Sequence, residues 1–131
     1  MISRIWHGWT KPENADAYEA LLRSEIFQGI ARRSIQGYRG IHLLRRDVAE
    51  EVEFVTIMWF ESLEAVRVFA GDDYEVAVVP PKARQLLSRF DARSAHYQAV
   101  AAPIVRCEGK RTLLKWNHRP GVPPCERSAG E

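Results

Sequence analysis

The sequence predicts an α+β fold whose strands and helices follow the order β-α-β-β-α-β. Residues 52–62 are nearly uncharged and rich in β-branched and aromatic side chains, which is typical of a central strand. Two segments, beginning near residues 12 and 62, carry apolar residues at helical spacings of three and four. Residues 47–51 are polar and few enough for a hairpin connection. This order predicts a ferredoxin-like arrangement, with a four-stranded antiparallel sheet and helices on one face.

The first half of the chain predicts a strand, a helix and a second strand. Residues 2–9 mix β-branched and aromatic side chains, as a first strand does. Thr10 and Glu13 match a capping box, so a helix should begin there. Its apolar stripe consists of Tyr18, Leu21, Leu22 and Ile26. Gly29 is placed to end this helix, residues 30–35 leave room for a further turn, and residues 38–46 form the second strand.

The second half predicts a broken helix and a last strand. Ser62 is a suitable N-cap for a helix over residues 63–70, with Leu63, Val66 and Phe69 as its buried stripe. Residues 74–79 fit either a helical turn or a loop. Pro80 and Pro81 can open a further helix, which the spacing of Ala83, Leu86, Leu87 and Phe90 extends to residue 90. Residues 93–100 form the last strand.

Length, composition and charge describe an ordinary globular domain with a tail. The 131 residues are 46% hydrophobic and 27% charged, and the net charge of +2 gives no general reason to expect a nucleic acid or an anionic membrane as partner. No apolar run approaches the roughly 20 residues that span a bilayer. The first residues do not resemble a secretion signal, so a cytoplasmic location is expected.

The composition changes after residue 100. Residues 1–100 predict one domain, and the proline-rich and basic residues 101–131 predict a flexible C-terminal extension in which only residues 112–116 resemble a strand. The two cysteines, Cys107 and Cys125, both lie in this extension. Their spacing does not match a zinc site, and in a reducing compartment we expect free thiols.

The central strand has two apolar faces. Phe54, Thr56, Met58 and Phe60 share one face, because side chains alternate along a strand, and Val55, Ile57 and Trp59 share the other. Helices can cover only one of them. Leaving the large side chains of the second face in water forgoes several kcal/mol at about 25 cal/mol per Å². Pairing with a second copy would recover this energy, so we expect a homodimer.

Five segments resemble the antibiotic biosynthesis monooxygenase family. They are residues 5–10, 17–22, 37–41, 53–65 and 95–97. The resemblance covers about residues 1–100 and implies a dimeric α+β barrel. The family includes quinone-forming monooxygenases, haem-degrading enzymes and members without known activity, so the fold alone does not assign the chemistry.

The resemblance to the haem-degrading branch breaks down at its key positions. That branch has a tryptophan two residues before the serine that opens the second helix, an asparagine on the first strand and an iron-binding histidine on the second helix. Here Phe60 takes the tryptophan position, with Trp59 one residue away on the other face. His7 is the nearest polar candidate on the first strand, and residues 74–79 hold no histidine. Haem degradation is therefore not expected, because the iron would lack an axial ligand.

The oxygenase branch requires less of the protein. Its members are thought to oxidise phenolic or anthrone-like substrates without flavin or metal, which implies no cofactor. An apolar slot, a base and shielding from water would suffice. His7 is the preferred catalytic base, on the hypothesis that strand parity places it beside Met58 and Phe60. The candidate substrate-binding residues are Phe54, Met58, Trp59, Phe60, Tyr74, His42 and His96.

Three functions fit this sequence. The first is a cofactor-independent monooxygenase acting on a small aromatic molecule such as a phenol, anthrone or quinol. The second is a non-catalytic homodimer that binds a small hydrophobic ligand, and the third is a haem-binding protein with another iron ligand. Histidines and aromatic residues on strands are more often structural than functional. The first function is therefore favoured only slightly over the second.

Overall fold

The computed structural model describes residues 1–101, 105–107 and 110–112. The chain divides into two compact units, Met1–Ala99 and Val100–Glu131. The first unit holds the predicted sheet and helices. In the second unit, strands β6 (Val105–Cys107) and β7 (Lys110–Thr112) pair as an antiparallel hairpin that the sequence reasoning did not anticipate. Most of the predicted C-terminal extension, including Cys125 and residues 113–116, lies outside the described residues, as does the side chain of Cys107.

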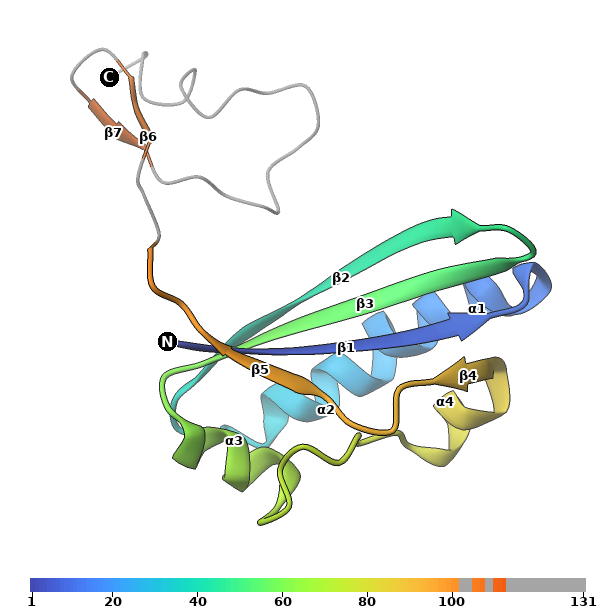
Figure 1. Cartoon of the computed structure of the whole chain (residues 1–131), viewed down its shortest axis with the longest axis horizontal. Coiled ribbons are helices and arrows are strands. Elements are labelled where there is room, and N and C mark those ends of the chain that lie inside the picture. The colour runs from blue at the N-terminus through green and yellow to red at the C-terminus, as the bar shows by residue number, and fades with distance from the viewer. Residues whose placement is uncertain (102–104, 108–109, 113–131) are drawn as a thin grey trace. The chain divides into compact units, whose positions relative to one another are not determined.

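The sheet of the first unit is antiparallel and open, as the ferredoxin-like prediction requires (Figure 1). Strands β1 (Ile2–Thr10), β2 (Tyr38–Val48) and β3 (Glu51–Phe60) lie in the order β2-β3-β1, so the predicted central strand pairs on both sides. The hairpin between β2 and β3 turns at Ala49, which has a positive φ of 55°. This confirms the predicted antiparallel neighbours.

The fourth strand position is shared by two short strands. Strand β4 (Leu87–Phe90) pairs with one end of β1 and β5 (Ala95–Gln98) with the other, which makes five strands rather than the predicted four. The helix predicted to reach residue 90 was wrong, because α4 (Pro81–Leu86) stops at Leu86 and Leu87 is extended. Pairing with β1 instead packs the half-buried Phe90 ring beside Trp6, with ring centroids 6.0 Å apart.

The first helix is longer than predicted and begins differently. Helix α1 (Pro12–Leu21), the π-helical segment η1 (Leu22–Ile26) and α2 (Phe27–Arg32) follow one another without a break. The capping box was wrong: Thr10 is fully buried in β1, and Lys11 is an N-cap without a side-chain hydrogen bond. Gly29 does not end the helix either. The packing of Ile26, Phe27 and Ile30 against the core carries the helix across the glycine.

Helix α3 (Leu63–Ala70) begins as predicted, because the Ser62 hydroxyl accepts a hydrogen bond from the Ala65 N–H at 3.2 Å. Its buried residues are Ala65, Val66 and Phe69, whereas Leu63 is 37% exposed, contrary to the predicted stripe. Residues 74–79 form no helix, and Val76 makes a single bridge to Arg93. Across the described residues, no helix is long and apolar enough to cross a lipid bilayer.

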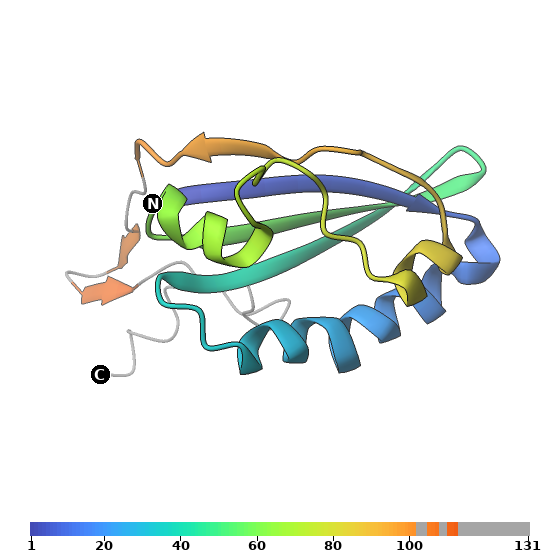
Figure 2. The ribbon, with the colours of Figure 1, turned by 90° about the horizontal axis from the view of Figure 1, so that it is seen from below.

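All the helices of the first unit lie on one side of the sheet (Figure 2). The covered side, called the helix face below, contains two core clusters. One surrounds Phe54 and Tyr18, and the other surrounds Phe60, Val66 and Phe69. The opposite side is called the outer face. Its residues include Leu44 and Tyr97, which are 50% and 58% exposed.

Candidate functional site

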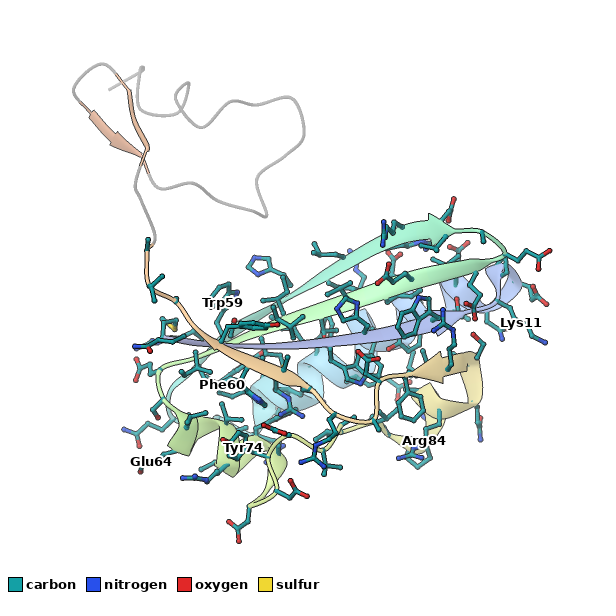
Figure 3. The ribbon with its side chains drawn as sticks, viewed as in Figure 1. Lys11, Trp59, Phe60, Glu64, Tyr74 and Arg84 are labelled. Atoms are coloured by element: carbon teal, nitrogen blue, oxygen red, sulfur yellow. The ribbon has the colours of Figure 1, made fainter. Side chains whose placement is uncertain are left out.

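The strand register separates the predicted site residues into two groups. His7 pairs with Val55 and His42 with Ile57, which places both histidines and Trp59 on the outer face. Met58, Phe54, Phe60 and His96 belong to the helix face, where Tyr74 also lies, beside α3 (Figure 3). The expectation that His7 lies beside Met58 and Phe60 was therefore wrong.

His7 is held by a buried carboxylate on the outer face. Its Nδ1 lies 2.8 Å from Glu53 Oε2, and Arg46 Nε donates to Glu53 Oε1 at 2.7 Å. These two hydrogen bonds keep the pKa of the Glu53 carboxyl below its usual range. The imidazole also stacks on Trp9, with ring centroids 6.1 Å apart. Every charge of this group has a partner, which is the arrangement of a structural network.

His42 and Trp59 form a separate pair on the same face. The Trp59 indole Nε1 donates to His42 Nδ1 at 3.2 Å. His42 Nδ1 is therefore the acceptor, and the tautomer with hydrogen on Nε2 is favoured. On this face, the pair contributes apolar surface and one internal hydrogen bond.

Phe54 and Phe60 are fully buried core residues. The Phe54 ring meets Tyr18 edge-on at 4.8 Å between centroids, and the Phe60 ring lies 5.9 Å from Phe69. Neither is among the residues that line the cavity described next. Both hold the helices against the sheet.

A cavity of about 60 Å³ lies on the helix face, between the sheet and the helices. Of the predicted residues, Met58 lines it. Its wall is mainly apolar and includes Trp6, Leu22, Ile26, Ile41, Met58 and Val79. The polar residues that line it are Arg4, Tyr18, Thr56 and Ser94. A cavity with an apolar wall and a few convergent polar groups is the usual form of a small-molecule site.

Arg4 is a buried cation at this cavity. The residue is 3% exposed and forms no ion pair among the described residues. Its guanidinium donates to the carbonyl oxygen of Tyr74 and, at 3.1 Å, to that of Val76. Its centre lies 5.4 Å from the centroid of the Phe69 ring. Burial lowers the pKa of Arg4 to about 10, because water is removed from the charged form.

His96 and Tyr74 flank Arg4. His96 Nε2 lies 3.1 Å from Arg4 Nη1, and the His96 and Tyr74 rings meet edge-on at 5.1 Å between centroids. Because arginine only donates, Nε2 accepts and the hydrogen of His96 belongs on Nδ1. Burial, and next the charge of Arg4, lower the pKa of His96. His96 is therefore a neutral imidazole at neutral pH.

The sequence reasoning missed Arg4 and Ser94. Ser94 is 5% exposed, and its hydroxyl has no hydrogen-bond partner among the described residues. The missed signal is the alternation of side chains along β1. Arg4 lies with Ile2 and Trp6 on the side of β1 that faces the helices, where a buried charge is costly. In residues 1–101, no three His, Cys, Asp or Glu side chains are grouped as a metal site would require.

The comparisons with known proteins identify the fold. The structure is similar to the crystal structure of a Bacillus cereus protein provisionally assigned as an antibiotic biosynthesis monooxygenase. The TM-score is 0.56 at 16% sequence identity, over 78% of this chain and 95% of that chain. No family model matches the chain, and a search of the curated proteins finds no match. The resemblance read from the sequence is thus confirmed at the level of the fold.

Proposed function

We propose that the protein is a cofactor-independent monooxygenase acting on a small phenol or hydroquinone bound in the cavity on the helix face. The observation that carries this proposal is Arg4, a buried cation without a counter-ion in the described residues, at the wall of an apolar cavity. The volume of about 60 Å³ excludes polycyclic anthrones, and even a single-ring substrate requires side chains of the wall to move outward.

The chemistry needs little beyond this wall. A phenol reacts slowly with O₂, whereas its anion is a much better electron donor. The positive charge of Arg4 stabilises the anion, and the apolar wall keeps water away from the reacting ring. In the overall reaction, a hydroquinone and O₂ give a hydroxyquinone and water. One oxygen atom enters the ring, the other leaves as water, and the substrate supplies all four electrons.

The test measures whether an oxygen atom of O₂ enters the quinone product. Purified protein without added metal or flavin is incubated with a single-ring hydroquinone under ¹⁸O₂, and the quinone is analysed by mass spectrometry. Incorporation of one ¹⁸O supports a monooxygenase. Peroxide formation without incorporation indicates simple autoxidation and contradicts the proposal.

Arg4→Met should slow this reaction at least about tenfold at neutral pH, since a charge-assisted hydrogen bond contributes about 1.5–3 kcal/mol. The defect should shrink as the pH rises, because the free substrate then ionises without help. Arg89→Met is the matched control: Arg89 lies on the outer face and packs over Trp9 at 3.9 Å. An equal loss in both variants would remove Arg4 from the site.

We also propose that two copies of the chain pair through their outer faces. This proposal is supported by the exposed side chains of Leu44 and Tyr97 and the half-buried Val55, Ile57 and Trp59 on that face. Light scattering should report twice the chain mass of 15.0 kDa at micromolar concentration. A particle of single-chain mass would contradict the dimer.

A further inference from the structure

Two N–H groups of Arg4 have no hydrogen-bond partner among the described residues. A guanidinium carries five N–H donors. Nη1 is engaged by the Tyr74 carbonyl oxygen and His96 Nε2, and one hydrogen of Nη2 by the Val76 carbonyl oxygen. The Nε–H and the second hydrogen of Nη2 have no partner among the described residues. A guanidinium with free N–H groups can donate to the oxygens of an anion.

Ser94 adds a third free donor. Its hydroxyl is buried and unpaired among the described residues, and the residue lines the same cavity as Arg4. The Ser94 N–H donates to the Glu75 carbonyl oxygen at 2.6 Å, so its backbone is fixed by the same segment whose carbonyl groups fix Arg4. Three unused donors therefore belong to two residues that are at least nine-tenths buried.

None of the residues that line the cavity carries a charge opposite to that of Arg4. The lining residues include no aspartate or glutamate. A buried hydroxyl or cation without a partner is costly, so such groups are usually paired with protein, water or ligand. Here a bound anion would satisfy both residues at once, whereas a neutral ligand would leave the cation unbalanced.

We propose that Arg4 and Ser94 form a subsite that binds the ionised oxygen of the aromatic ligand, as phenolate or carboxylate, and discriminates against neutral ligands of the same shape. The Nε–H and Nη2–H of Arg4 donate to this oxygen group, and the Ser94 hydroxyl donates alongside them. The inference rests on the proposed function for the identity of the cavity as the substrate site, and it adds the ligand class and a specificity residue, Ser94.

The experiment uses probes that O₂ does not consume. Binding of benzoate and of its neutral analogue benzamide to the full chain is measured by calorimetry. For the phenolate arm, 4-nitrophenol is held just below its own pKa, and the yellow phenolate is recorded with and without protein. Wild-type protein should bind benzoate at least about tenfold more tightly than benzamide, and it should raise the phenolate fraction.

The variants separate the two residues. Arg4→Met should abolish the preference for benzoate and the rise in phenolate. Ser94→Ala should weaken benzoate binding about three- to tenfold. Arg89→Met should leave both readouts unchanged. Arg4→Lys keeps the charge but loses the fork, so if Arg4→Met does not fold, a reduced preference in Arg4→Lys supports the subsite and an unchanged preference contradicts it.

The outcomes distinguish this inference from the proposed function. Anion preference without ¹⁸O incorporation leaves the subsite standing and contradicts the oxygenase. Arg4-dependent ¹⁸O incorporation with equal affinity for benzoate and benzamide, and no rise in phenolate, overturns the subsite. A response to benzoate alone identifies a carboxylate ligand, and a response to 4-nitrophenol alone identifies a phenolate; either supports the subsite.

Discussion

On the outer face, Glu53 is 6% exposed and each of its carboxylate oxygens is paired, one with His7 and one with Arg46. On the helix face, Arg4 is 3% exposed and forms no ion pair among the described residues. Both residues are charged and buried in neighbouring strands of one sheet. The paired charge belongs to the scaffold, whereas the charge that lacks a counter-ion beside a cavity is the one we propose as a ligand site.

The largest expected effect tests how differently the two faces are packed. Phe60→Ala on the helix face should lower the free energy of unfolding by about 3–5 kcal/mol, because the side chain is fully buried and leaves a cavity. Ile57→Ala, on the outer face of the same strand, should cost clearly less at protein concentrations that dissociate the dimer. Urea unfolding measures both. Equal losses would mean that the outer face is as well covered within one chain as the helix face.

A smaller effect tests what covers the outer face. Leu44→Glu should weaken the dimer at least about tenfold, because each interface would gain two buried like charges. Leu63→Glu is the matched control, since Leu63 is 37% exposed but lies on α3, away from the outer face. Sedimentation at a series of concentrations gives the dissociation constants. If both variants dimerise equally well, the interface does not include Leu44.

The smallest expected effect concerns the paired charge. Glu53→Gln should cost about 1 kcal/mol, because its two charge-assisted hydrogen bonds, whose other partners His7 and Arg46 are partly exposed, become neutral ones. His7 and Arg46 lower the pKa of Glu53 below its ordinary 4.5, so this contribution is present above pH 4.5 and disappears as the pH falls through the folded-state pKa. The difference in stability between the two proteins should shrink as the pH falls from 7 toward 3. A constant difference over this range would show that the carboxylate charge contributes nothing.

The sequence predicted the elements that depend on local pattern. The central strand, the hairpin at residues 47–51 and the Ser62 cap all follow from neighbouring residues, and the structure contains each of them. Thr10 also matched a local pattern, but pairing with Val52 and Leu87 draws it into the sheet. The predicted end of the helix at Gly29 failed for a similar reason, because contacts distant in sequence outweighed a local preference.

The site depended on register, which the local pattern does not contain. In the pair of β1 with β3, Ile2 lies opposite Phe60, so even-numbered residues of both strands face the helices. His7 therefore cannot approach Met58, and Arg4 can. A charged residue at an even position of β1 was visible in the sequence. Only the pairing shows that this position faces a cavity rather than solvent.

The π-helical segment η1 determines which side chains reach the cavity. There the Phe27 N–H bonds to the Leu22 carbonyl oxygen, five residues back, so the helix accommodates one residue more than regular α-helical winding would. An unbroken α-helix would turn everything after Ile26 by about 100° around the axis. Phe27 and Ile30, both part of the wall, would then face elsewhere. The shape of the pocket thus depends on the one extra residue in this π-helical turn. Deleting one residue from the turn would change the apolar wall of the pocket but not its polar residues.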